Sequence, residues 1–182
     1  MELVSTLAHH GPYTRADLDA MPDDGRRHEL LDGALIVTPA PADRHQAIVV
    51  NLIVLLKQAA SAELRVRTAP YDVTLAEDTI VQPDVLLAHK RDITESGLPG
   101  VPVLAVEVLS PSTRLMDLNL KRARYEEAGI PHYWVVDPDE PALIAFELRE
   151  GAYVESVRVG GADLFEVTEP VRLRLRPSEL VD

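Results

Sequence analysis

The chain has 182 residues, a formal net charge of −12 and a hydrophobic fraction of 46%. A chain of this length can bury a core of its own, so stability requires neither a disulfide nor a structural metal. Because it contains no cysteine, disulfides, thiolate zinc sites, iron–sulfur clusters and a cysteine nucleophile are excluded, and any metal must be held by oxygen or imidazole.

The first 75 residues predict a helix, a hairpin, a longer helix and two strands. Thr14 and Asp17 form a capping box that opens the short first helix. Asp32-Gly33 accepts the positive φ angles of a tight turn, so the strands on either side should pair as a hairpin. The longer helix has one stripe of apolar residues at helical spacing. In chain order these elements lie at about 15–21, 28–31, 34–38, 43–60, 64–68 and 71–75.

From residue 80 onward, apolar runs predict strands around one more substantial helix. The runs 80–88 and 103–109 contain few polar residues and are typical of buried strands. Ser110 and Pro111 fit the N-cap and first position of the helix, and Gly129 fits its C-terminal stop. In chain order these elements lie at 80–88, 103–109, 110–128, 133–136, 142–148, 152–159 and 171–176. Together they predict an α+β chain with a mixed, strand-rich sheet.

The apolar stretches are too short for a membrane helix. The longest, at 48–56 and 101–109, contain Asn51 and Glu107 and fall short of the ~20 residues that such a helix needs. Residues Met1–His10 lack the basic flank and apolar run of a secretory signal. We therefore expect a cytoplasmic protein with no membrane partner, folded as one domain over residues 1–182 with a core of about 14–180.

Two carboxylates interrupt the runs that predict buried strands. Asp84 precedes the apolar residues 85–88, and Glu107 lies inside the run 103–109. An ionised carboxylate in such a strand costs several kcal/mol unless a cation or hydrogen bonds compensate it. Taken alone, Asp84 is typical of an edge or turn residue, whereas Glu107 is as compatible with a functional site as with a structural role.

A shared position for these two acids would suit a metal. If the strands are neighbours, Asp84 and Glu107 can reach one point and hold a hard divalent cation such as Mg²⁺ or Mn²⁺ through oxygen. A bound metal polarises a phosphoryl oxygen, generates hydroxide and stabilises the leaving alkoxide. The pair therefore indicates the chemistry of phosphodiester hydrolysis.

The helix after Glu107 carries a polar series at intervals of four residues. Asp117, Lys121 and Tyr125 fall along one helix face, from which Lys121 could point back at the carboxylates. Its ammonium would stabilise a pentavalent phosphate or, with a depressed pKa, help to activate water. Spacing alone favours the simpler alternative, an ordinary surface ion pair between Asp117 and Lys121.

These residues belong to a longer set of motifs that resembles the Uma-two family of restriction-endonuclease-like proteins, in the PD-(D/E)xK nuclease superfamily. The resemblance covers roughly residues 14–180, and its most specific part is the EVLSPST block with the downstream Asp, Lys and Tyr. The motifs are His28-Glu29-Leu30-Leu31-Asp32-Gly33, His45, Pro83-Asp84-Val85, Val106-Glu107-Val108-Leu109-Ser110-Pro111-Ser112-Thr113, Asp117, Lys121, Tyr125, Gly129 and Tyr133-Trp134-Val135-Val136-Asp137. The resemblance implies a restriction-endonuclease-like mixed β-sheet core flanked by helices, with additional antiparallel strands.

The resemblance also implies a ligand set. Asp84 resembles the metal-binding aspartate of the superfamily and Glu107 its second acidic ligand, with the Val108 carbonyl as a third oxygen. The chain departs from the superfamily pattern at Leu109, where the lysine two residues after the second acid is expected. In the Uma-two family that lysine is displaced onto the following helix, which indicates Lys121.

Supporting residues follow from the same resemblance. Glu29 resembles an additional acidic residue near the N-terminus of such nucleases, and a structural role beside the hairpin is equally compatible with its position. His45 recurs in the family pattern and could approach the metal or a phosphate, although a lone histidine near a helix start is more often a cap or surface residue. Asp117 and Tyr125 would then orient Lys121.

Four residues around the predicted helix start are candidates for substrate binding. Ser110, Ser112 and Thr113 could present hydroxyls and helix N-terminal amides to a phosphate, although simple capping explains at least one of them. Arg114 begins a locally basic segment, 113–125, in which basic residues outnumber Asp117. We therefore expect positive charge beside the site.

The overall acidity opposes binding to DNA, because phosphate neutralisation drives that binding and a charge of −12 repels phosphates. Two predicted strands carry arginines at every second position, so the arginines of each strand share one of its faces. These residues are Arg65 and Arg67 on one strand and Arg172, Arg174 and Arg176 on the other. Such stripes are more typical of solvated faces than of DNA grooves. A content of 4% aromatic residues also argues against a broad base-stacking surface.

We expect a Mg²⁺- or Mn²⁺-dependent endonuclease that hydrolyses DNA, with Asp84 and Glu107 as ligands and Lys121 as the transition-state or water-activating cation. The alternative is a non-catalytic nucleic-acid or protein interaction module that retains the fold. The acidity and the missing short-spaced lysine favour the alternative, whereas the complete set of three residues favours the enzyme. A homodimer is expected by analogy with nucleases that cut two strands. No helix-turn-helix or zinc-finger pattern indicates a target sequence.

Overall fold

The computed structural model describes residues 11–22 and 24–181, so the segment Met1–His10, which was considered above as a secretory signal, lies outside the described residues. The helical elements are α1 (Arg15–Asp19), α2 (Asp43–Ala59), η1 (Lys90–Asp92), η2 (Met116–Lys121), α3 (Arg122–Ala128) and η3 (Pro177–Leu180). The strands are β1 (Arg27–Leu31), β2 (Ala34–Thr38), β3 (Leu64–Thr68), β4 (Val73–Ala76), β5 (Thr79–Val81), β6 (Val85–His89), β7 (Leu98–Pro99), β8 (Leu104–Val108), β9 (His132–Asp137), β10 (Ala142–Arg149), β11 (Ala152–Gly160), β12 (Phe165–Val167) and β13 (Leu173–Leu175). Within these ranges no helix is long and apolar enough to cross a membrane.

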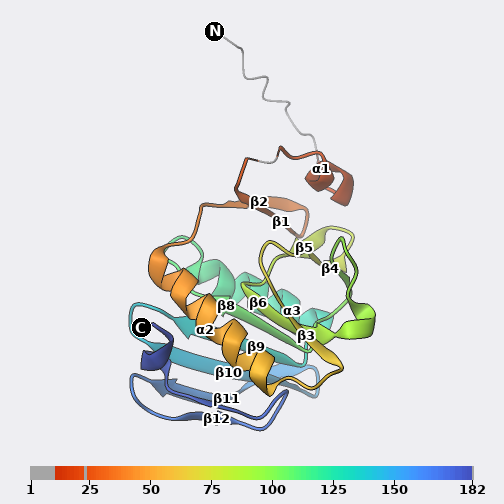
Figure 1. The fold of residues 1–182 in the computed structure, drawn as a ribbon. Coiled ribbons are helices and arrows are strands. Elements are labelled where there is room, and N and C mark those ends of the chain that lie inside the picture. Colours follow the sequence, from red (N-terminus) through yellow and green to blue (C-terminus); the bar gives the residue numbers. More distant parts are fainter. Residues whose placement is uncertain (1–10, 23, 182) are drawn as a thin grey trace.

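The strands form two main sheets, and the helices cover both faces of the larger one (Figure 1). The six-stranded sheet has the order β11-β10-β9-β8-β6-β3, and the five-stranded sheet has the order β2-β1-β5-β4-β7. Neighbouring strands are antiparallel except for the parallel pairs β8–β9 and β4–β7. On one face of the six-stranded sheet lie α2 and the separate pair β12–β13, whereas α3 packs on the other face.

The α+β class predicted from the sequence is confirmed, and several elements follow their local signals. The helix α1 carries the predicted capping box. Asp32 at φ 54° and Gly33 at φ 72° form the turn between β1 and β2. The helix α2 ends one residue before its predicted limit, and Gly129 at φ 84° ends α3.

The prediction of one continuous strand over residues 80–88 was wrong. This segment forms β5 in the five-stranded sheet and β6 in the six-stranded sheet, with a break at Gln82-Pro83-Asp84. Pro83 has no N–H to donate to a strand ladder, which favours an interruption at this position. The chain therefore passes from one sheet to the other immediately before Asp84, which places that carboxylate where the two sheets meet.

The prediction of a regular α-helix from Ser110 to Ala128 was also wrong in its first half. Residues 111–113 form a turn, and η2 is a π-helix that continues directly into α3. Residues four apart in an α-helix drift by about 40° around its axis, since it has 3.6 residues per turn. The wider π turn offsets this drift, so that Asp117, Lys121 and Tyr125 are all buried.

The C-terminal segment contains one strand more than predicted. The predicted strand 171–176 is shortened to β13, which pairs with β12. Phe165 of β12 packs edge-to-face on Trp134, with 5.2 Å between the ring centroids. Trp134 is buried, as the sequence predicted.

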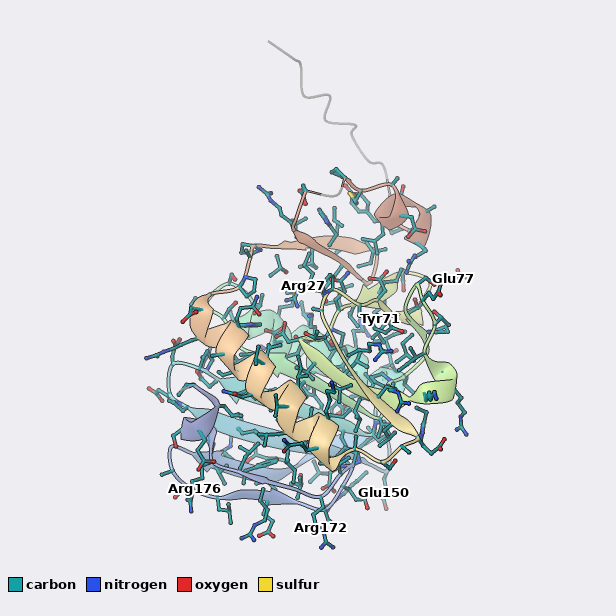
Figure 2. The ribbon with its side chains drawn as sticks, viewed as in Figure 1. Arg27, Tyr71, Glu77, Glu150, Arg172 and Arg176 are labelled. Atoms are coloured by element: carbon teal, nitrogen blue, oxygen red, sulfur yellow. The ribbon has the colours of Figure 1, made fainter. Side chains whose placement is uncertain are left out.

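The arginines of this segment are exposed. Figure 2 shows Arg172 and Arg176 at the outer edge of the molecule, next to β12 and β13. Arg174 pairs with Glu166 of β12 at 3.4 Å, and Arg176 lies 3.9 Å from Glu179. These side chains therefore form a solvated face that is already partly paired with acids.

Candidate active site

Two adjacent strands bring the predicted acids together. The strands β6 and β8 are antiparallel neighbours, with Val85 opposite Val106. Asp84 directly precedes Val85 and Glu107 directly follows Val106, so the two acids lie at opposing positions. The backbone N–H of Val108 donates to Asp84 Oδ2 at 2.8 Å. This contact brings the backbone N–H of Val108 to Asp84. The resemblance implied a different role for Val108, with its carbonyl oxygen as a third metal ligand.

Lys121 points from η2 into the space beside Glu107. Its Nζ lies 3.0 Å from Glu107 Oε1 and 2.9 Å from Glu29 Oε1, and 3.9 Å from Asp117 Oδ1. The hydroxyl of Tyr125 donates to the same Glu107 Oε1 at 2.6 Å. All five side chains have almost no exposed surface. Lys121 is therefore a buried cation shared by carboxylates, and its pair with Asp117 is not the surface ion pair that spacing alone favoured.

Asp84 has a separate set of partners. Its Oδ1 accepts from Arg27 Nη1 at 2.7 Å, and its Oδ2 lies 3.1 Å from His45 Nε2. His45 is buried in the first turn of α2, so it is neither an N-cap nor a surface residue. Both oxygens of Asp84 are thus engaged by donors from β1, α2 and β8.

Glu29 connects these two groups of side chains. Its Oε1 accepts from Lys121 and from the backbone N–H of Gln82, the latter at 2.7 Å, and its Oε2 lies 3.6 Å from Arg27 Nε. Sequence reasoning missed both Arg27 and Gln82. One signal was available for Arg27, because residues two apart on β1 share a face of the strand and Arg27 precedes Glu29 by two.

The cluster contains more acids than permanent cations. Glu29, Asp84, Glu107 and Asp117 are buried together with the cations Arg27 and Lys121. Burial and the neighbouring carboxylates outweigh Lys121 and raise the pKa of Glu107 to about 8. Burial likewise raises the pKa of Asp117 to about 6.

Partners of opposite charge shift the pKa values of Asp84 and Lys121 toward the charged form of each side chain. Burial alone would raise the pKa of Asp84, but the hydrogen bond from His45 and the charge of Arg27 lower it to about 2. Burial alone would lower the pKa of Lys121, but Glu107 and Glu29 raise it above its ordinary value. These carboxylates therefore favour the charged form of Lys121, which suits electrostatic stabilisation better than action as a base.

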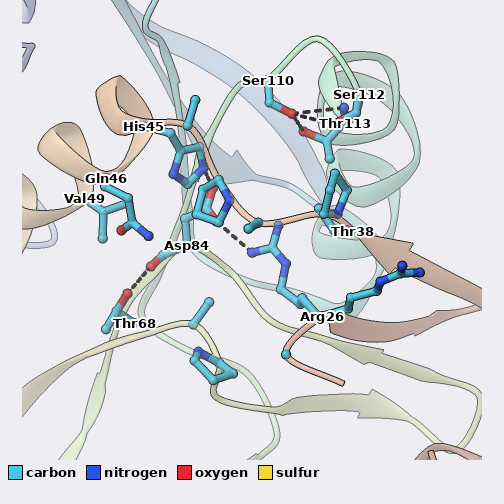
Figure 3. A pocket seen from close by; sticks show the side chains of 18 of the residues that line it. Arg26, Thr38, His45, Gln46, Val49, Thr68, Asp84, Ser110, Ser112 and Thr113 are labelled. Atoms are coloured by element: carbon cyan, nitrogen blue, oxygen red, sulfur yellow. Dashed lines mark hydrogen bonds and ion pairs between the residues drawn. The ribbon is translucent and has the colours of Figure 1, made fainter. Parts of the chain in front are cut away.

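The site opens to solvent through a pocket of about 540 Å³ (Figure 3). Asp84, His45 and Arg27 line this pocket. Glu107 and Lys121 do not line it and are each only 1% exposed. The two predicted metal ligands therefore differ in access: Asp84 faces the pocket and Glu107 lies behind it.

The donor chemistry of the cluster fits a hard divalent cation. Among the described residues, Glu29 Oε2, Glu107 Oε2 and Asp117 Oδ1 are buried oxygens without a hydrogen-bond partner. A buried carboxyl oxygen without a hydrogen-bond partner is unfavourable, and a bound cation would satisfy it. Within residues 11–22 and 24–181 no three His, Asp or Glu side chains are grouped at metal-ligand spacing. Mg²⁺ needs only one or two carboxylates, since it retains water and takes substrate oxygens as its other ligands.

The predicted substrate-binding residues separate into two kinds. Ser110 Oγ lies 3.0 Å from Ser112 Oγ and 2.9 Å from Thr113 Oγ1, and these three residues line the pocket. Ser110 Oγ also accepts from the Thr113 N–H at 3.3 Å, which is a capping contact. Arg114 instead points to Asp137, with its Nη2 2.6 Å from Asp137 Oδ2, and does not line this pocket.

The positive charge expected beside the site is largely neutralised. In addition to the Arg114 pair, Arg124 pairs with Asp32 at 2.6 Å and with Glu127. Arg122 lies over the ring of Phe146, 4.4 Å from its centroid. The segment 113–125 therefore does not form a free basic surface.

The six-stranded sheet is mixed and is flanked by helices. Of its adjacent central strands, β6 begins directly after Asp84 and β8 carries Glu107 near its end. This arrangement is a restriction-endonuclease-like fold. The chain belongs to the Uma2 family, described as "Putative restriction endonuclease", whose model matches residues 15–177. A crystal structure from Anabaena variabilis ATCC 29413, described as a "putative nuclease", is similar with a TM-score of 0.73 at 19% identity. The similarity covers 93% of this chain and 98% of that chain. No curated protein matches the sequence.

Replacing Arg27 by methionine should destabilise the fold by about 3 kcal/mol, because it leaves Asp84 and Glu29 buried without their shared cation. The matched control is Arg114→Met, whose ion pair is exposed and should cost less than about 1 kcal/mol. Urea unfolding of the two variants measures both values. Equal losses in the two variants would contradict the importance of the Arg27 contacts.

The stability of the metal-free protein should fall as the pH rises from about 5.5 to about 8.5. Glu107 and Asp117 have folded pKa values raised to about 8 and about 6, so the unfolded chain releases these protons first and is favoured by higher pH. We expect a loss of at least about 1 kcal/mol, measured by urea unfolding in the presence of a chelator. Glu107→Gln should reduce this slope, and a wild-type stability that rises over the same range would contradict the assignment.

Proposed function

We propose that this chain hydrolyses phosphodiester bonds of DNA in a reaction that depends on Mg²⁺ or Mn²⁺. The observation that carries the proposal is the meeting of Asp84, Glu107 and Lys121, from three separate parts of the chain, in one buried cluster with more acids than permanent cations. Membership of the Uma2 family, described as "Putative restriction endonuclease", supports the same reaction class.

Asp84 and Glu107 are the residues that would hold the metal. When bound, a divalent cation polarises the phosphoryl oxygen and lowers the pKa of its water. Such a cation would also take the place of the proton that the raised pKa of Glu107 retains near neutral pH. The unpartnered oxygen Glu107 Oε2 supports this role, because it is a buried acceptor for which the described residues supply no donor.

The remaining side chains would position the ligands and supply charge. Tyr125 fixes the carboxylate of Glu107 through its hydroxyl, and His45 fixes that of Asp84. Lys121 provides a permanent positive charge beside Glu107, suited to the charge that develops on a phosphate in the transition state. Arg27 engages Asp84 Oδ1. With a metal bound, Asp84 Oδ1 would serve as its ligand, and the guanidinium of Arg27 would be free to contact substrate phosphate.

One observation favours the alternative, a non-catalytic interaction module. Glu107 and Lys121 are each 1% exposed and already form a direct ion pair, so the cluster is also compatible with a purely structural network. A structural network has no reason to respond to divalent metal. Metal-dependent stabilisation therefore distinguishes the two functions.

Millimolar Mg²⁺ or Mn²⁺ should raise the thermal unfolding midpoint, because a ligand that binds only the folded state stabilises it. At a tenfold excess over the dissociation constant we expect a rise of about 3 °C. Asp84→Asn and Glu107→Gln should each abolish the rise, whereas Asp137→Asn, which changes an acid paired with Arg114 elsewhere, should retain it. A wild-type midpoint that does not respond to either metal would contradict the proposal.

Lys121→Met should reduce cleavage by at least about 100-fold while retaining most of the metal-induced rise in midpoint, because it removes charge but neither metal ligand. Cleavage is measured on supercoiled plasmid and on a single-stranded oligonucleotide with Mn²⁺. Glu107→Gln should lose both cleavage and the metal response. Equal rates for wild type and Lys121→Met would exclude a chemical role for this lysine.

A further inference from the structure

Tyr133 belongs to the motifs identified in the sequence, but the proposed function gives it no role. It lies on β9, opposite Ala105 of the parallel neighbour β8. Since Ala105 precedes Glu107 by two residues, Tyr133 and Glu107 project from the same face of the sheet. The side chain of Tyr133 is fully buried on this face, against which η2 and α3 pack. Its hydroxyl is therefore a buried polar group on the side from which Lys121 reaches the acids.

The Tyr133 hydroxyl contacts the backbone of η2. It donates to the carbonyl oxygen of Asp117 at 2.9 Å. In an α-helix this carbonyl would accept from the N–H of Lys121, four residues later. In the π-helix η2 an N–H bonds instead to the carbonyl five residues earlier, and the N–H of Arg122 bonds to Asn119 O. Tyr133 thus supplies a donor to a carbonyl that the π turn separates from its α-helical partner.

The π turn decides where Lys121 lies. With α-helical geometry between Asp117 and Lys121, the lysine would be rotated by about 40° around the helix axis. For a side chain that extends about 6 Å from the axis, this rotation corresponds to a displacement of about 4 Å. The Lys121 Nζ now lies 3.0 Å from Glu107 Oε1 and 2.9 Å from Glu29 Oε1. A displacement of this size would break both contacts.

Tyr133 is well suited to hold this turn, because its own position is fixed by packing. Burial and the charge of Glu107 raise the pKa of Tyr133 well above its ordinary value, so the hydroxyl keeps its proton and remains a donor. Three aromatic rings surround the side chain, with centroid distances of 5.2, 6.0 and 5.9 Å: Tyr125, Phe146 and Tyr153. The first of these donates its own hydroxyl to Glu107.

We propose that Tyr133 is a positioning residue for the cleavage reaction: its hydroxyl holds the π turn at Asp117 and so keeps the ammonium of Lys121 beside Glu107. The inference rests on the proposed function and adds a residue that touches neither a proposed metal ligand nor the substrate. It also explains why a buried tyrosine, rather than phenylalanine, lies at this point of β9.

The chain offers a matched control for Tyr133→Phe. Tyr153 is a second buried tyrosine of the same aromatic group, and its hydroxyl donates to the carbonyl of Ile130, also at 2.9 Å. This carbonyl lies after α3, away from the π turn. Each substitution therefore removes one buried hydroxyl and one bond to a backbone carbonyl, and the two variants should have similar thermal unfolding midpoints. Only Tyr133→Phe should affect Lys121.

Cleavage with Mn²⁺ tests the effect on the reaction. Tyr133→Phe should lower kcat by at least about tenfold and change KM by less than about twofold, because a displacement of about 1 Å in a reacting group is already costly. Tyr153→Phe should change kcat by less than about twofold. In a Lys121→Met background, Tyr133→Phe should lower the residual rate by less than about twofold, because it acts through the lysine.

Nuclear magnetic resonance of the metal-free protein tests the position of Lys121 without any cleavage. Burial and hydrogen bonds slow the exchange of ammonium protons with water, which makes such a group visible in ¹H–¹⁵N spectra. The Lys121 signal is assigned by its absence from Lys121→Met. Tyr133→Phe should raise the exchange rate of these protons by at least about tenfold, whereas Tyr153→Phe should leave it within about twofold of wild type.

Three results would overturn the inference. They are an unchanged Lys121 signal in Tyr133→Phe, equal effects of the Tyr133 and Tyr153 variants, and a full further loss of cleavage when Tyr133→Phe is added to Lys121→Met. The proposed function fails on a different result, a wild-type protein that neither responds to metal nor cleaves DNA. In that case the spectra of the metal-free variants still decide whether Tyr133 positions Lys121, so the two failures are distinguishable.

Discussion

The arrangement of this molecule depends on burying four carboxylates with two permanent cations. Glu29, Asp84, Glu107 and Asp117 come from different elements, and Arg27 and Lys121 each bridge at least two of them. Isolated buried carboxylates would cost several kcal/mol each, so the cluster is stable only as a connected network. Because β1 belongs to the five-stranded sheet and β6 and β8 to the six-stranded sheet, this network also joins the two sheets.

The excess of negative charge links this network to chemistry. The metal-free protein reduces the excess by retaining a proton on Glu107, whose pKa is raised to about 8. Three buried carboxylate oxygens nevertheless lack hydrogen-bond donors among the described residues. Apolar side chains of similar volume often stabilise a fold as much as buried ion pairs do. Stability alone therefore does not explain why four carboxylates are buried with only two permanent cations. The imbalance is therefore a physical reason to expect a cationic ligand.

The sequence predicted those parts of the site that local patterns encode. Glu107 was recognisable as an acid inside an apolar strand, and the spacing of Asp117, Lys121 and Tyr125 placed them on one helix face. Of the partners of Asp84, His45 and Val108 were named from the sequence, whereas Arg27 was missed. Arg27 reaches Asp84 across 57 positions of sequence, from a strand of the other sheet. The break at Pro83 also escaped prediction, although the missing N–H of proline is a local signal for it. The π turn of η2 escaped prediction because it depends on what the surrounding fold buries. The same is true of the pocket, whose walls come from segments distant in the chain.

A crystal structure of the protein grown with Mn²⁺, with anomalous scattering recorded at the manganese edge, tests the central claim most directly. The account predicts one anomalous peak within bonding distance of Asp84 and Glu107, with the guanidinium of Arg27 moved away from Asp84 Oδ1. It also predicts that Lys121 stays beside Glu107. An ordered cluster without manganese, in which Arg27 and Lys121 keep their present partners at saturating metal, would contradict it.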